Sequence, residues 1–97
     1  MSAYLIANVD VKDAEKLKDY MKATPAIIGQ FGGKFLVRGG DFEICEGNWQ
    51  PKRLVIVEFE SMQKAKQFYN SPEYKAIIGL RQNSAYTEFV FVDGVSA

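Results

Sequence analysis

The arginine at position 81 is the side chain of this sequence whose type and spacing best suit a binding site. Tyr74, Ile77, Ile78 and Arg81 fall at i, i+3, i+4 and i+7, which predicts one apolar stripe of a helix that carries a cation. Such a cation reaches water, pairs with a carboxylate or faces a bound anion. In the third case Arg81 anchors an anion in a pocket between helix and sheet.

The alternative for Arg81 is a structural ion pair. Its partner would be Glu58, Glu73 or Glu88, because buried charges usually meet a charged group of the protein first. Both interpretations stay open at the level of sequence.

Three tyrosines could frame a ligand beside Arg81. Tyr20 lies in the first predicted helical segment, whereas Tyr69 and Tyr74 lie in the second. Tyrosines at such positions are most often core residues with the hydroxyl near the surface. If the three converge on one cavity, they form a ligand-binding wall instead.

Asn8 and Glu58 interrupt the apolar faces of two predicted strands. Asn8 could hydrogen-bond a ligand. A desolvated Glu58 would have a raised pKa and could act as a base. Alternatively, Glu58 reaches solvent or pairs with Arg38 or Arg81.

Trp49 lies in the loop between the second and third predicted strands, where it could cover a pocket or contact a second copy of the chain. The second alternative is favoured, because tryptophan suits half-wet interfaces. Arg53 would then form a salt bridge across that interface.

Composition excludes several function classes. The chain has 97 residues with 12 basic and 12 acidic side chains, interleaved, so no charged field attracts nucleic acid or membrane. It has no histidine, which argues against a metal site, a haem site or a histidine-dependent nucleophile, and we expect no cofactor. A single cysteine favours a reducing cytoplasm.

The predicted elements follow the order β-α-β-β-α-β within one domain, residues 1–97. Pro25 should kink or restart the first helix near Thr24, and Gly39-Gly40 should form a bulge or turn in an extended path that continues through residues 42–46. The second helical segment is broken by Ser71-Pro72. The expected strands are residues 4–9, 34–38, 53–60 and 86–92. This order predicts an α+β, ferredoxin-like antiparallel sheet with strand order 4-1-3-2.

Both faces of the predicted sheet are apolar. The third strand, for example, has Leu54 and Ile56 on one face and Val55 and Val57 on the other. Helices can cover only one face, so a second copy of the sheet is expected to cover the other. We therefore expect a homodimer that packs sheet against sheet.

Several motifs of the chain resemble domain-of-unknown-function family 1330. They are residues 3–7, 31–40, 46–49, 57–59, 71–74 and 80–81. The resemblance implies a ferredoxin-like fold of the dimeric α+β-barrel type. That superfamily includes cofactor-independent monooxygenases, muconolactone-isomerase-like proteins and haem-dependent members whose histidine is absent here.

The function expected from these observations is binding of a small organic ligand by a small homodimeric protein. The ligand would be an anion if Arg81 anchors it, and the protein could be a cofactor-independent monooxygenase-like or isomerase-like enzyme. A non-catalytic binding or sensing module and a purely structural dimer are the alternatives. A pocket lined by the named side chains would favour binding or catalysis, and a filled core would favour the structural role.

Overall fold

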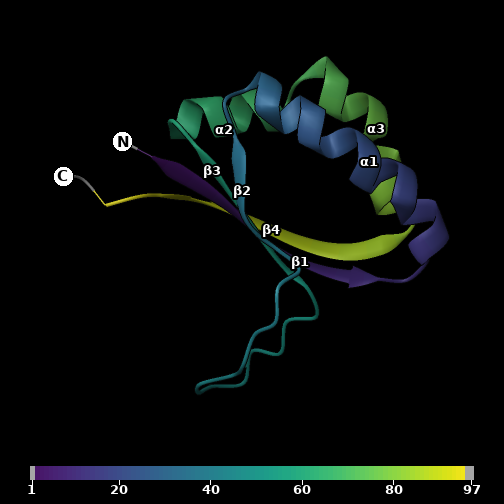
Figure 1. The fold of residues 1–97 in the computed structure, drawn as a ribbon, viewed down its shortest axis with the longest axis vertical. Coiled ribbons are helices and arrows are strands. Elements are labelled where there is room, and N and C mark those ends of the chain that lie inside the picture. Colours follow the sequence, from purple (N-terminus) through teal and green to yellow (C-terminus); the bar gives the residue numbers. More distant parts are fainter. Residues whose placement is uncertain (1, 96–97) are drawn as a thin grey trace.

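The computed structural model describes residues 2–95 and folds them into a four-stranded sheet with three helices on one of its faces (Figure 1). The elements in chain order are β1 (Ala3–Val11), α1 (Ala14–Gln30), β2 (Lys34–Arg38), β3 (Leu54–Phe59), α2 (Met62–Tyr69), α3 (Pro72–Gln82) and β4 (Ala85–Asp93).

The sheet is antiparallel throughout, and its order β2-β3-β1-β4 confirms the predicted topology and the α+β class. In register, Ala7 of β1 lies between Val55 of β3 and Phe89 of β4. Successive side chains of a strand point to opposite faces. Residues 5, 7 and 9 of β1 therefore face the helices, and residues 4, 6 and 8 lie on the outer face.

Each helix begins at a side chain that caps it. Asp13, Ser61 and Ser71 accept hydrogen bonds from backbone amides three residues later, each at 3.1 Å. These bonds satisfy amides that have no partner within the helix. Pro72 then occupies the first turn of α3, as its sequence predicts.

Of the kink or restart expected near Thr24, the restart is wrong, because α1 runs without interruption through Pro25. Proline lacks the amide hydrogen that would bond the Met21 carbonyl. That carbonyl accepts a hydrogen bond from Nη2 of Arg38 instead, at 2.7 Å. A contact from another element thus replaces the bond that Pro25 cannot make.

Two details of β2 also differ from prediction. The irregularity in its pairing with β3 lies between Phe35 and Val37, at Leu36, and not at Gly39-Gly40. Gly39 has a φ of +75° and leads the chain out of the strand. Residues 42–46 form no strand and are exposed, because they lie in a long loop that projects from the sheet without a neighbouring strand to pair with (Figure 1).

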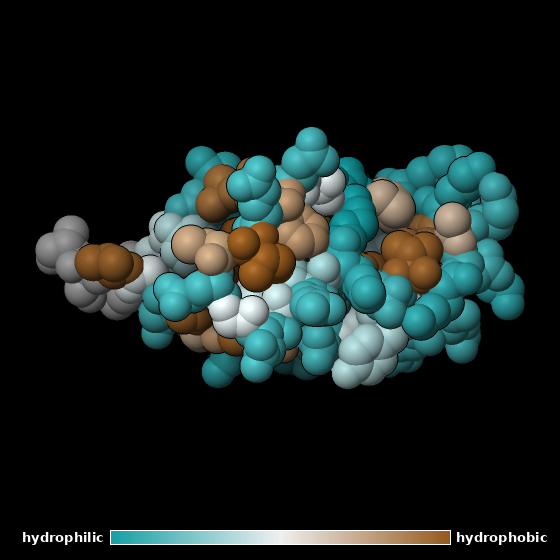
Figure 2. Space-filling view, turned by 90° about the horizontal axis from the view of Figure 1, so that it is seen from below, coloured by the Kyte–Doolittle hydropathy of each residue, from teal (hydrophilic) through white to brown (hydrophobic). Residues whose placement is uncertain are grey.

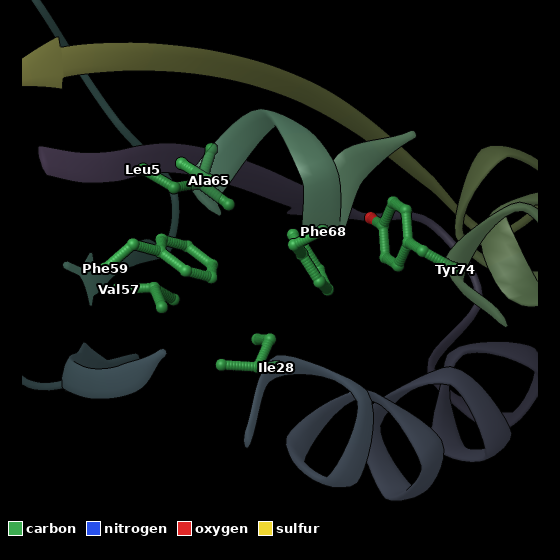
Figure 3. Packing of buried hydrophobic residues seen from close by; sticks show 7 residues of the cluster. All are labelled: Leu5, Ile28, Val57, Phe59, Ala65, Phe68 and Tyr74. Carbon is green, nitrogen blue, oxygen red and sulfur yellow. The ribbon is translucent and has the colours of Figure 1, made fainter. Parts of the chain in front are cut away.

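The core lies between the helices and the sheet. Phe68 of α2 is its centre, with ring centroids 5.5 Å from Phe59 and 4.5 Å from Tyr74. Figure 3 shows these rings in a row, with Ile28 of α1 approaching from the opposite side. Burial of such large side chains contributes roughly 1.5–3 kcal/mol each.

The outer face of the sheet is partly apolar and uncovered in the single chain. Tyr86 and Val90 of β4 are 59% and 58% exposed, and Val92 is also exposed. Figure 2, which views the molecule from below the sheet, shows apolar surface interrupted by polar side chains. Across residues 2–95, no helix is long and apolar enough to cross a membrane.

Candidate functional site

A pocket lies between α1 and the helix-facing side of the sheet. Its apolar walls include Leu5 and Val9 of β1, Leu17 of α1, Val55 of β3 and Phe89 of β4. The space open to the centre of a water molecule is about 60 Å³, which is room for roughly four to six waters. Each water occupies about 30 Å³ of liquid volume, so these waters correspond to a cavity of roughly 120–180 Å³. A cavity of this size could hold one aromatic ring.

Arg81 is the buried cation of this pocket and is only 5% exposed. Its Nε donates to the Tyr74 hydroxyl at 3.3 Å, and its Nη1 donates to Oγ1 of Thr87. The guanidinium carbon lies 4.4 Å from the centre of the Phe89 ring. This geometry fixes the orientation of the guanidinium without neutralising its charge.

No carboxylate forms an ion pair with Arg81 within residues 2–95. Glu58 pairs with Lys34 at 3.4 Å, and the other described ion pairs join Lys12 to Asp10 and Lys18 to Glu15. The described lining of the pocket also contains no acidic side chain. Of the two interpretations of Arg81, the geometry therefore favours the anion anchor over the ion pair.

Two tyrosines extend the hydrogen-bond chain from Arg81. The hydroxyls of Tyr20 and Tyr74 lie 2.6 Å apart, and both residues line the pocket. Burial raises the pKa of the Tyr20 hydroxyl, and the neighbouring Tyr74 raises it further. Tyr20 is therefore a neutral hydroxyl near pH 7, able to donate or accept one hydrogen bond.

Arg38 and Arg53 also line the pocket. The bulge at Leu36 pairs Val37 with Ile56 on the outer face and Arg38 with Val55 on the helix face. Burial lowers the pKa of Arg53, and the like charge of Arg38 lowers it further. The two arginines thus form a cationic pair at the pocket.

These two arginines line the pocket, and the sequence did not identify them in this role. The sequence suggested Arg38 only as an ion-pair partner of Glu58, and Arg53 only as a residue of the dimer contact. The extended pattern of residues 34–38 contains no signal for the bulge, so regular alternation would direct Arg38 to the wrong face.

Tyr69 lies behind the pocket wall. Its ring packs against Tyr74, Phe89 and Phe91, with centroids 5.6, 6.3 and 6.1 Å away, and it is not a lining residue. Tyr69 packs against Tyr74 and does not line the pocket.

Asn8 and Glu58 lie on the outer face of the sheet, away from this pocket, because each neighbours a helix-facing residue in its strand. Asn8 donates to Oε1 of Glu88 at 3.0 Å and accepts from the amide of Lys52 at 2.8 Å. Hydrogen bonds from Ser2 and Lys34 lower the pKa of Glu58. A base would need the opposite shift.

Trp49 is 59% exposed in the projecting loop, and so are Phe42 and Ile44 to lesser degrees. It does not cover the pocket in the single chain. No group of three or more His, Cys, Asp or Glu side chains arranged to hold a metal ion occurs among the described residues.

Solved structures with this fold have little sequence identity to the chain. A Rhodopseudomonas palustris protein of unknown function superposes with a TM-score of 0.78 at 15% identity, over 99% of this chain and 84% of the other. SnoaB, a cofactor-independent oxygenase from Streptomyces nogalater, gives 0.67 at 9% identity, over 99% and 95%. A dimeric ferredoxin-like protein of unknown function from Bacteroides fragilis gives 0.60 at 12% identity, over 96% of each chain. These similarities establish the fold.

The sequence itself identifies the family. No curated protein is significantly similar to the chain. The sequence profile described as Domain of unknown function (DUF1330) matches residues 2–95, nearly the whole chain. The resemblance read from its motifs is thereby confirmed, and the chain belongs to the DUF1330 family.

Proposed function

We propose that this protein binds a small organic anion with an apolar body in the pocket between α1 and the sheet. The observation that carries the proposal is the buried guanidinium of Arg81, which lines an apolar pocket with no carboxylate among the described lining residues. Burying a charge without a counter-charge costs several kcal/mol. A bound carboxylate or enolate would offset that cost.

Arg81 keeps donor capacity for such a ligand. Its Nε and Nη1 bond Tyr74 and Thr87, but no described residue accepts from Nη2. No fully enclosed side-chain nitrogen or oxygen of the described residues lacks a partner. Nη2 is therefore open to the pocket or to solvent, where an anion can accept its protons.

Turnover of the bound anion is a second candidate function. The observation that favours it is the chain of Tyr20, Tyr74 and Arg81, whose fixed dipoles and charge would stabilise negative charge that develops on a substrate. SnoaB, described as a cofactor-independent oxygenase, shares the fold. Oxygen uptake and product formation in a metabolite extract, compared between wild type and Arg81→Met, test this candidate.

We also propose that the protein is a homodimer built on the outer sheet face. The exposed apolar side chains of β4 support this, because two such faces would bury each other. The Bacteroides fragilis protein of similar fold is described as dimeric.

The exposed free thiol of Cys45 supports a reducing, cytoplasmic location.

The test of anion binding is Arg81→Met. Calorimetric titration with p-toluate, an aromatic monocarboxylate, should show binding to wild type and at least about tenfold weaker binding to the variant, because a charge-assisted hydrogen bond is lost. Stability in urea should stay the same or rise, since the variant no longer buries an uncompensated charge.

Lys75→Met is the matched control. It removes the same charge from the same helix, but Lys75 lies over the ring of Tyr69 and outside the pocket. It should leave p-toluate affinity unchanged. Unchanged affinity in Arg81→Met, or a large loss of its stability, would contradict the proposal and indicate a structural role for Arg81.

A further inference from the structure

Three arginines cross one end of the sheet in a row beneath α1. Arg81 donates a hydrogen bond to Thr87 of β4, and Thr87 pairs with Val9 of β1. The amide of Val9 donates in turn to the carbonyl of Arg53, at 2.8 Å. The backbones of β4 and β3 at this level are two strand spacings apart, about 10 Å. Arg38 follows on β2, beside Val55. Arg81 therefore enters the pocket beside β4, whereas Arg53 and Arg38 enter it beside β3 and β2.

Arg38 is exposed and Arg53 is half-buried, and like the buried Arg81 neither has a counter-charge among the described residues. Neither side chain forms an ion pair within the described residues, and no acidic side chain lines the pocket there. Burial lowers the pKa of Arg53 most, and repulsion by the neighbouring cation Arg38 lowers it further. An anion between the two arginines would relieve that repulsion.

The fold holds both arginines toward the pocket. Arg38 donates to the Met21 carbonyl that Pro25 leaves free, and its guanidinium carbon lies 4.6 Å from the centre of the Phe35 ring. Gly39 makes room for Arg53, because a Cβ at this position would lie 2.6 Å from Nε of Arg53. The φ of Gly39, +75°, also disfavours other residues. These contacts orient two cations that form no ion pair with a carboxylate of the described residues.

We infer that the ligand is a dianion, with one acidic group on Arg81 and a second on the Arg38–Arg53 pair, joined by an apolar body about one aromatic ring long. This inference rests on the proposed function, since it assumes that Arg81 binds the first group. It adds the ligand class: dicarboxylates, or carboxylates with a second acidic group, in preference to monoacids. The walls of Leu17, Val55 and Phe89 suit the apolar body.

Two matched pairs of acids test the inference at 0.15 M salt. Terephthalate and p-toluate have nearly the same shape but differ by one carboxylate, and adipate and hexanoate form a flexible pair. Wild type should bind the diacid at least about tenfold more tightly in one pair or both, the effect of an added charge-assisted contact. Arg53→Met and Arg38→Met should remove this preference and leave monoacid affinity nearly unchanged.

Lys52→Met is the control for general charge attraction. It removes the cation next to Arg53, but Lys52 is exposed and does not line the pocket. The diacid preference should survive this change. Equal affinity for diacid and monoacid in both pairs, or an equal loss of preference in Lys52→Met, overturns the inference.

Failure of the inference can be told apart from failure of the proposed function. If p-toluate binds through Arg81 but diacids show no advantage, the dianion is wrong and the anion pocket stands. If Arg81→Met binds p-toluate as wild type does, the proposed function is wrong. Absence of measurable binding of all four acids at millimolar concentration overturns both.

Discussion

At the scale of single residues, the notable feature is a buried cation held by neutral groups. Arg81 meets a tyrosine hydroxyl, a threonine hydroxyl and an aromatic face, and none of these carries a full negative charge. Neutral partners orient a guanidinium but leave its field unbalanced. An arginine in this setting is suited to attract a charged ligand.

Tyr74 should be the residue on which this arrangement depends most. Tyr74→Phe removes the hydroxyl that bonds both Tyr20 and Arg81. The half-buried Tyr20 hydroxyl and the buried Arg81 guanidinium then each lose a partner, which should lower the free energy of unfolding by about 1–3 kcal/mol. Urea denaturation at pH 7 measures the change.

The control for that variant is Tyr69→Phe. Tyr69 belongs to the same aromatic cluster, but it takes no part in the hydrogen bonds that join Tyr74 to Tyr20 and Arg81. Its removal should change stability by less than about 0.5 kcal/mol. Equal losses in the two variants would mean that the hydrogen-bond chain contributes nothing specific.

At the scale of elements, two departures from regular structure, one in β2 and one in α1, determine the position of the Arg38 side chain. The bulge at Leu36 turns Arg38 toward the helices, and Pro25 in α1 leaves free the carbonyl that Arg38 binds. A regular strand and a proline-free helix would be more stable in themselves. Such departures are expected where a site needs them.

Pro25→Ala tests this link. The alanine amide can bond the Met21 carbonyl and displace Arg38 from it. Because proline inside a helix is costly, the free energy of unfolding should rise by about 1–2 kcal/mol, net of the lost Arg38 contact. The preference for terephthalate over p-toluate should fall.

Urea denaturation and calorimetric titration on the same preparation measure both effects. Arg38→Met provides the reference for complete loss of the Arg38 contact. A Pro25→Ala protein that is less stable than wild type, with an unchanged diacid preference, would contradict the link between helix and strand.

At the scale of the whole molecule, the three helices cover one face of the sheet and leave the other to solvent (Figure 1). The uncovered face carries exposed aliphatic and aromatic side chains of β4, including Val90 and Tyr86. A surface of this kind commonly packs against another protein surface. A second copy would provide one of the same shape and polarity.

Val90→Lys should prevent the proposed dimer. Val90 pairs with Ile6 on the outer face, within the edge strand β4, and is 58% exposed, so a lysine there leaves the single chain folded. In a dimer the same lysine would be buried against apolar side chains. Sedimentation equilibrium at micromolar concentration should give twice the mass of one chain for wild type and a single chain for the variant.

Leu80→Lys is the matched control, because Leu80 is a partly exposed apolar residue on the helical side. It should sediment like wild type. A wild-type protein that sediments as one chain would contradict the dimer, and an unchanged dimer in Val90→Lys would place the interface elsewhere.

The sequence by itself determined the order of elements, the antiparallel sheet and the family. Helix caps such as Asp13 and Ser71 and the apolar stripe ending at Arg81 are local signals, readable without knowledge of packing. They identified Arg81, Tyr74 and Tyr20, which the structure brings together around one pocket. The helix restart expected at Pro25 does not occur, since Arg38, which is distant in sequence, donates the hydrogen bond that the Met21 carbonyl would otherwise lack.

Only the tertiary structure decided which face of each strand became the site. Both faces are apolar, so the sequence could not show which one the helices cover, and Asn8 and Glu58 lie on the other face. Arg38 reaches the pocket through a one-residue bulge, and a shift of one residue reverses every side chain that follows. Register depends on pairing between strands that are distant in sequence, so no local pattern of residues specifies it.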